Sequence, residues 1–250
     1  MIPCVLPGDG SGVAGTLRAV SFDAAGTLFH PLAPIGELYA EVAARHGIHT
    51  DPLHLHERFR AAFRSAPPLA FPPMAPAELR AAEKGWWRAV VSEVFAEISL
   101  PDFDAYFDDL FAFFGSVEPW RADPDAAPLL MRLRAAGVRI LVVSNFDARV
   151  RDVLAALGLA SLIDHVTISS EAGAAKPDPR IFATALAAAG VAAGEVLHVG
   201  DTAREDLAAA RAAGLDVILV GGDELAAEAP DATRVTTLGA VAPFIERRLG

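Results

Sequence analysis

Residues 18–28 read RAVSFDAAGTL, and this stretch decides the fold of the chain. Its first part, residues 18–22, is short and largely apolar, which is typical of a buried strand. The strand ends directly at Asp23, and the pair Gly26 and Thr27 follows. Ligands bind at the carboxyl ends of the strands in parallel sheets, so we expect Asp23 to lie in a functional site.

The second half of the chain repeats a helix, a glycine and a short β-branched strand. Apolar residues at helical spacing precede Gly137, Gly158, Gly190 and Gly214, and glycine commonly ends a helix. Buried strands are expected at 138–143, 196–199 and 217–220. This alternation predicts an α/β fold in which a parallel sheet has helices on both faces.

A region of different character, about residues 32–116, separates the first strand from this regular half. It shows helical patterning without convincing strands, and prolines between residues 67 and 76 interrupt it. We interpret it as a helical cap inserted into a core made of residues 16–31 and 117–250. Residues 1–15 are glycine-rich and are expected to form a loose N-terminal tail.

The cap is rich in aromatic residues and also carries arginines. Core packing is the favoured interpretation of the aromatic residues, Trp86 and Trp87 included, over contact with a substrate. We expect cap side chains to set substrate specificity. Arg58, Arg60 and Arg64 are candidates, but periodicity does not rank them.

The composition excludes several classes of protein. With 250 residues and 53% hydrophobic content, the chain can bury a large core. Its net charge of −11 argues against nucleic acid or an anionic membrane as the main partner, since both attract basic patches. No apolar run is long enough to suggest a membrane span, residues 1–15 lack the basic stretch expected of a signal peptide, and Cys4 is the one cysteine. We therefore expect a cytoplasmic protein without disulfides. The sequence does not determine its oligomeric state.

Two aspartates that each follow an expected strand predict a metal site. Asp23 and Asp201 would raise each other's pKa if they met without a cation between them. A hard ion such as Mg²⁺ would be held by both carboxylates and by the backbone carbonyl of Ala25. Asp206 would orient the metal-bound waters, although capping of the next helix explains it equally well.

Further residues predict the binding of a phosphorylated small molecule. Phosphate esters repel nucleophiles, so hydrolysis needs a held nucleophile, a divalent cation and donors for the phosphate oxygens. Asp23 is the candidate nucleophile. Thr27 and Ser144 offer hydroxyl groups, and Asn145 offers its backbone amide. Lys176 offers an ammonium group to the phosphate and to Asp23. Each alone could be an ordinary turn or surface residue, but the ordered set favours a catalytic site.

Four motifs occur in one order, namely Phe22-Asp23-x-x-Gly26-Thr27-Leu28, Val143-Ser144-Asn145, Lys176-Pro177-Asp178-Pro179 and Gly200-Asp201-x4-Asp206. This set resembles the haloacid dehalogenase superfamily of hydrolases, and the insertion after the first motif resembles its helical C1 cap class. Within that superfamily, Trp86-Trp87, Ser144-Asn145-Phe146-Asp147-x-Arg149, Ser170-Glu171-Ala172-Gly173 and His198-Val199-Gly200-Asp201 are similar to the haloacid dehalogenase-like hydrolase domain-containing protein 3 group. The resemblance covers about residues 18–222. It implies a Rossmann-like core, an aspartyl nucleophile and Mg²⁺.

Ala25 departs from the phosphatase pattern that this resemblance implies. Phosphatases of the superfamily have an aspartate there, which protonates the leaving oxygen and then activates water. General acid–base catalysis is typically worth about 10²- to 10⁴-fold in rate, so ordinary alkyl phosphates should react slowly. His30 lies nearby in the sequence, but a hydrogen-bonded structural role is its favoured interpretation.

Three alternatives stay open because of Ala25. The 2-haloacid dehalogenases resemble the chain in having a non-acid there, but they work without metal, and Asp201 would then be an uncompensated charge beside Asp23. Phosphonoacetaldehyde hydrolase has a similar first motif and uses a cap lysine. Lys84 is the one lysine of this cap, and its sequence context does not resemble that enzyme's. A catalytically impaired phosphate-binding or regulatory protein is the third alternative.

Overall fold

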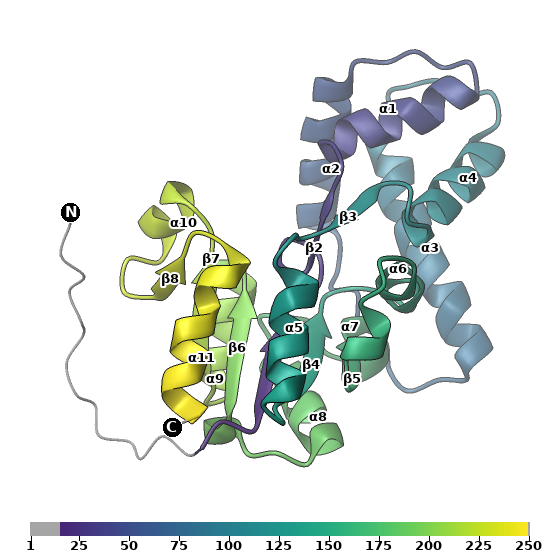
Figure 1. Cartoon of the computed structure of the whole chain (residues 1–250). Coiled ribbons are helices and arrows are strands. Elements are labelled where there is room, and N and C mark those ends of the chain that lie inside the picture. Colours follow the sequence, from purple (N-terminus) through teal and green to yellow (C-terminus); the bar gives the residue numbers. More distant parts are fainter. Residues whose placement is uncertain (1–15, 250) are drawn as a thin grey trace.

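A six-stranded parallel sheet forms the centre of the molecule (Figure 1). The computed structural model describes residues 16–249, so the predicted tail at 1–15 lies outside the described residues. The strand order is β5-β4-β1-β6-β7-β8, and every neighbouring pair is parallel. The strands are β1 (Ala19–Phe22), β4 (Arg139–Ser144), β5 (His165–Ile168), β6 (Val196–Gly200), β7 (Asp216–Val220) and β8 (Thr233–Val235). The predicted α/β fold class is confirmed.

Helices cover both faces of the sheet, because successive side chains of a strand point to opposite faces. Ile140 and Val142 pack in one cluster with α5 (Ala126–Ala135), α6 (Val150–Ala156) and α11 (Ala242–Leu249). Leu141 and Val143 pack in another with α8 (Arg180–Ala189) and α9 (Ala208–Ala212). The remaining helices of this part are α7 (Ser169–Ala172) and α10 (Asp223–Glu228), with helical turns η1 (Ala160–Leu162), η2 (Ala193–Glu195), η3 (Ala203–Leu207) and η4 (Leu238–Val241).

The strands nearest the middle of the sheet match the prediction within one residue at each end. Central β1 pairs with β4 on one side and with β6 on the other, which places Phe22 between Val142 and Val199. The helix expected before Gly214 does not begin as an ordinary α-helix, because its first turn, η3, is a wider π-helical turn that α9 continues. Strands β5 and β8 were not anticipated.

Helices α1 (Ile35–Arg45), α2 (Pro52–Ser65), α3 (Pro76–Val94) and α4 (Phe103–Gly115) form the insertion, at the upper right of Figure 1. Residues 32–116, all described by the structure, contain no strand. These helices bury a hydrophobic cluster of their own around Leu55, Val94 and Tyr106. The exact domain boundaries stay a prediction. No helix within residues 16–249 combines the length and apolarity needed to cross a membrane.

A two-stranded antiparallel ribbon joins the insertion to the rest of the chain. It consists of β2 (Phe29–Pro31) and β3 (Trp120–Ala122). Just beyond it, the backbone amide of Leu32 donates to the carbonyl of Pro119 over 2.8 Å. The chain therefore leaves and re-enters the core at neighbouring points, beside the residues that follow β1.

Candidate active site

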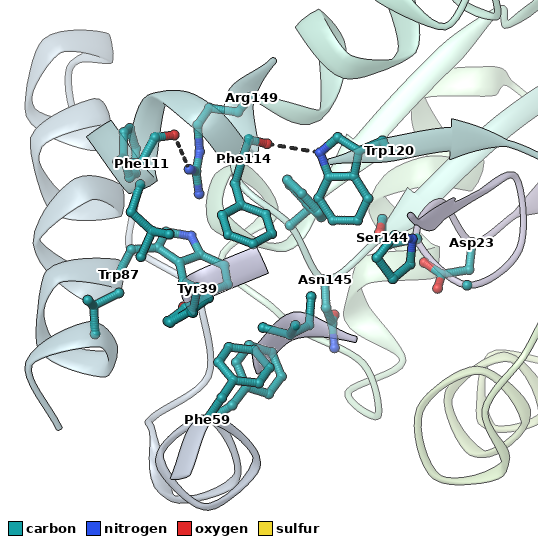
Figure 2. Close-up of a pocket in the computed structure, with 18 of the residues that line it drawn as sticks. Asp23, Tyr39, Phe59, Trp87, Phe111, Phe114, Trp120, Ser144, Asn145 and Arg149 are labelled. Atoms are coloured by element: carbon teal, nitrogen blue, oxygen red, sulfur yellow. Dashed lines mark hydrogen bonds between the residues drawn. The ribbon is translucent and has the colours of Figure 1, made fainter. Parts of the chain in front are cut away.

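The carboxyl ends of three neighbouring strands bring the predicted residues together. Asp23 follows β1, Ser144 ends β4 and Asp201 follows β6. All three line one pocket of about 340 Å³, together with side chains from the helical insertion (Figure 2). The meeting of these residues at one edge of the sheet is what parallel strand topology predicts.

Lys176 links two buried carboxylates. Its Nζ atom lies 2.8 Å from Oδ1 of Asp23 and 2.6 Å from Oδ1 of Asp206. Burial alone would lower the pKa of this ammonium group, but the two carboxylates raise its pKa above the usual range. Burial raises the pKa of Asp23, and the charge of Lys176 opposes that rise. Lys176 thus stays charged and favours the ionised form of Asp23.

Asp206 is fully buried, and both of its oxygens contact protein donors. Oδ1 accepts from Lys176 and lies 3.1 Å from Nε2 of His198. Oδ2 accepts from the backbone amides of Asp201 and Thr202 and from the Thr202 hydroxyl. Burial acts to raise the pKa of Asp206, but Lys176 and His198 bring it well below the usual range. Asp206 therefore holds Lys176 and the Asp201 backbone in place, and its role toward metal-bound water stays a prediction.

Three carboxylates are close enough to hold a cation. Asp23, Asp201 and Asp206 each offer an oxygen, and these atoms lie within 4.8 Å of one another. Burial, with the nearby charge of Asp23, raises the pKa of Asp201 to about 8. Burial and the charge of Asp23 therefore favour the protonated form of Asp201, whereas a bound cation would favour the ionised form. A Cβ atom on Gly26 would collide with the Asp201 carboxylate, so glycine leaves the room that this carboxylate occupies. Hard divalent ions prefer oxygen donors, so this set fits an ion of that kind.

The other predicted residues lie at the same edge of the sheet. Thr27 is buried, and its hydroxyl donates to Oδ1 of Asp201 over 3.4 Å. Ser144 and Ala25 line the pocket. For Asn145 we expected only a role of the backbone amide, but its side chain also makes hydrogen bonds in the site. Its side chain accepts from the backbone N of Lys176 at 2.7 Å and donates to the backbone O of Lys176 at 2.9 Å, so it fixes the loop that carries the lysine.

Two polar residues of the site were not found from the sequence. Glu205 lines the pocket and accepts from the Asn145 side chain at 3.0 Å. Burial raises the pKa of Glu205, and the charge of Lys176 opposes this. Glu205 was not predicted, because an acidic residue in the first turn of a helix is ordinarily explained by its favourable interaction with the helix dipole. His198 is buried between Asp206 and the Ser21 hydroxyl, with Nδ1 2.9 Å from that oxygen.

The pocket has a polar floor and aromatic walls. The floor carries Asp23, Ser144, Asn145, Asp201 and Glu205. The walls include Tyr39, Phe59, Phe63, Trp87, Phe107, Phe111, Phe114, Trp120 and Phe146. Many of these rings, Trp87 included, also pack in the hydrophobic clusters, as expected, so they line the pocket in addition to packing.

The arginines considered for specificity lie elsewhere. Arg58 donates to the backbone carbonyls of Glu93 and Val94, and none of Arg58, Arg60 and Arg64 lines the pocket. His30 is 3.0 Å from the carboxylate of Asp123, which agrees with a structural role.

These features define a class of protein, the capped α/β hydrolases with an aspartate at the end of the first strand and a buried lysine beside it. A family model for haloacid dehalogenase-like hydrolases matches residues 17–214, and the chain belongs to this family of hydrolases. It is 35% identical over 211 residues to haloacid dehalogenase-like hydrolase domain-containing protein 3 of Mus musculus, covering 83% of each chain. The predicted resemblance is confirmed.

Solved structures support the fold. The L-2-haloacid dehalogenase from Xanthobacter autotrophicus superposes with a TM-score of 0.69 at 21% identity, covering 94% of this chain and 100% of that one. The HAD phosphatase from Thermococcus onnurineus gives a TM-score of 0.63 at 22% identity, covering 92% and 98%. Since the two have different activities, the shared fold does not select the reaction.

Proposed function

We propose that this chain is a Mg²⁺-dependent, phosphatase-like hydrolase of small phosphorylated molecules, acting through an aspartyl phosphate at Asp23. The observation that carries the proposal is the ion pair of Asp23 with buried Lys176, beside Asp201. A carboxylate oxygen of Asp23 would attack phosphorus, and the bond from phosphorus to the leaving oxygen would break. Water would then release phosphate from Asp23. When bound, Mg²⁺ would offset the charge that the carboxylates and the phosphate bring together.

Lys176, Ser144 and Asn145 would prepare this reaction. The charge of Lys176 opposes the rise in pKa that burial imposes on Asp23, and it so favours the ionised form that a nucleophile requires. Ser144 lies in the floor of the pocket, where its hydroxyl could donate to a phosphate oxygen. Asn145 holds the backbone of Lys176 on both sides, so the ammonium group is fixed before the substrate binds.

Ala25 restricts the substrates that would react quickly. It lines the pocket next to Asp23 and has no proton to give to a leaving group. Leaving groups that depart without a proton, such as those of acyl or enol phosphates, would therefore be favoured over alkoxides. The loss of an acid corresponds to about 10²- to 10⁴-fold in rate on alkyl esters.

The pocket supports the alternative reactions less well. A 2-haloacid carries a carboxylate, and Arg149 is the one lysine or arginine among the described residues that line the pocket. All three of its guanidinium nitrogens already donate, two to Asp147 and one to the carbonyl of Phe111. Lys84 pairs with Asp108 at 2.8 Å and does not line the pocket, which disfavours Schiff-base chemistry through a cap lysine.

Phosphate release from acetyl phosphate with Mg²⁺ tests the proposal. Wild type should turn over, Asp23→Asn should lose the activity, and Ala25→Asp should gain activity on alkyl phosphates. A wild type that is silent on all phosphates while Ala25→Asp is active would instead indicate a phosphate-binding protein. Chloride release from 2-chloropropionate without metal would favour the dehalogenase. As a readout independent of turnover, Mg²⁺ should raise the melting temperature of wild type and not that of Asp201→Asn.

A further inference from the structure

Six aromatic side chains of the insertion line the pocket. This aromatic subsite consists of Tyr39 from α1, Phe59 and Phe63 from α2, Trp87 from α3, and Phe107 and Phe111 from α4. Figure 2 shows Asp23 and Ser144 at one end of the pocket and Trp87 and Phe111 at the other. Every helix of the insertion thus contributes an aromatic ring to the same cavity.

The rings of the subsite are ordered by contacts with one another. Phe63 stacks on Trp87 with ring centroids 6.0 Å apart and planes 27° apart, and it stacks on Phe59 at 5.5 Å and 26°. The indole Nε1 of Trp87 donates to Oδ2 of Asp147 over 2.5 Å, which fixes the ring against the core. Aromatic faces fixed in this way favour another flat ring, through offset stacking and edge-to-face contacts.

The subsite has no unpaired charge for a polar substrate group. Arg149 lies at its border, with the guanidinium carbon 3.7 Å from the centre of the Phe111 ring. Asp147 neutralises this charge with two hydrogen bonds, and the carbonyl of Phe111 takes a third. Apart from the Tyr39 hydroxyl, these rings offer a substrate no side-chain hydrogen-bond partner, so a sugar or a second anionic group would lose more hydration here than it regains.

We infer that the substrates are aryl phosphates, with the phosphate at Asp23 and the aromatic ring in the aromatic subsite. The inference rests on the proposed function, because it places a phosphate at the carboxylate floor. It also agrees with Ala25, since a phenol has a pKa of about 10 and leaves as phenolate far more readily than an alkoxide leaves unprotonated. Asp23 and the aromatic subsite line the same cavity of about 340 Å³, so the proposal places the phosphate and the ring of one molecule in a single cavity.

Binding of non-hydrolysable phosphonates tests this inference without turnover. Isothermal titration with Mg²⁺ present would compare phenylphosphonate, butylphosphonate and methylphosphonate on the full chain. Phenylphosphonate should bind at least about tenfold more tightly than the other two, the equivalent of about 1.4 kcal/mol. In Phe63→Ala this preference should fall to about threefold or less. Since Phe63 is 39% exposed, its truncation should not unfold the chain, and Phe59→Leu gives a second variant.

Phe103→Ala is the matched control. Phe103 is a partly buried ring of the same insertion and does not line the pocket, so this variant should keep the full preference. Equal affinity for phenyl and butyl ligands, or a preference that survives in both Phe63→Ala and Phe59→Leu, would overturn the inference. Failure of the proposed function would give a different result. Acetyl phosphate has no ring, and its hydrolysis would then not depend on Asp23.

Discussion

Replacing Lys176 by methionine removes the positive charge that balances the carboxylates at the sheet edge. Its Nζ atom is 2.8 Å from Asp23 and 2.6 Å from Asp206, and Asp201 lies in the same cluster. Methionine has similar length and volume, so the loss is mainly one of charge. Removing one partner of a buried ion pair costs about 3–5 kcal/mol, because the other charge stays buried without compensation.

This free energy predicts a large change in melting temperature. For a chain of this size, 1 kcal/mol corresponds to about 2–4 °C, so Lys176→Met should melt roughly 6–20 °C below wild type at pH 7.5 without metal. Acid should relieve the effect. The folded variant would bind protons at carboxylates that are already ionised in the unfolded chain above about pH 4, so its stability should rise as pH falls toward that value. Mg²⁺ should restore part of the stability by supplying positive charge.

Thermal unfolding followed by circular dichroism, at pH 5 and pH 7.5, with and without Mg²⁺, measures these effects. Lys84→Met is the control, because Lys84 and Asp108 form an exposed pair with side chains 46% and 62% accessible. Such pairs contribute about 0–1 kcal/mol. A loss in Lys176→Met no larger than in the control, or one that acid does not reduce, would refute the charge balance described here.

Two further predictions concern Gly26 and Glu83. Gly26→Ala should lose phosphate release and about 1–2 kcal/mol of stability, since φ is 97° and a Cβ would strike Asp201. Gly47→Ala, with φ 73° and open space around it, should lose stability but keep activity. Glu83 accepts a hydrogen bond from the Ser170 hydroxyl, and burial raises its pKa above the ordinary value of 4.5. Its contribution to the free energy of unfolding is therefore fully present below pH 4.5, and it is lost as pH rises through the pKa of the folded state. Glu83→Gln keeps the acceptor without the buried charge and should raise the melting temperature at pH 8, so a lower melting temperature than wild type at pH 8 would contradict this reasoning.

The central sheet could be predicted from the sequence because its strands are buried on both faces. A continuous apolar run such as residues 140–143 is then visible without knowledge of its neighbours. Strand β5 could not be found in this way, since His165 and Thr167 interrupt a four-residue strand at the edge of the sheet. Pairing with β4, not composition, determines that this segment is extended.

Some residues of the candidate site could likewise be predicted from the sequence, and others could not. Asp23, Ser144 and Asp201 were predictable because each lies at the end of its strand or directly after it, so topology alone brings them together. The bond between Trp87 and Asp147 joins residues 60 positions apart, on the insertion and the core, and no local pattern encodes it. The aromatic subsite was missed for the same reason, since a ring facing a cavity and a ring facing a core share one helical periodicity.

The ribbon of β2 and β3 makes the insertion exchangeable. Its two ends approach so closely that the amide of Leu32 reaches the carbonyl of Pro119, a separation that a short hairpin turn can span. A shortened or transplanted segment could therefore be spliced in at this point without altering the order of the six strands. Substrate choice and carboxylate chemistry can accordingly diverge in separate steps, one by replacing the inserted helices and the other by changing residues at the strand ends.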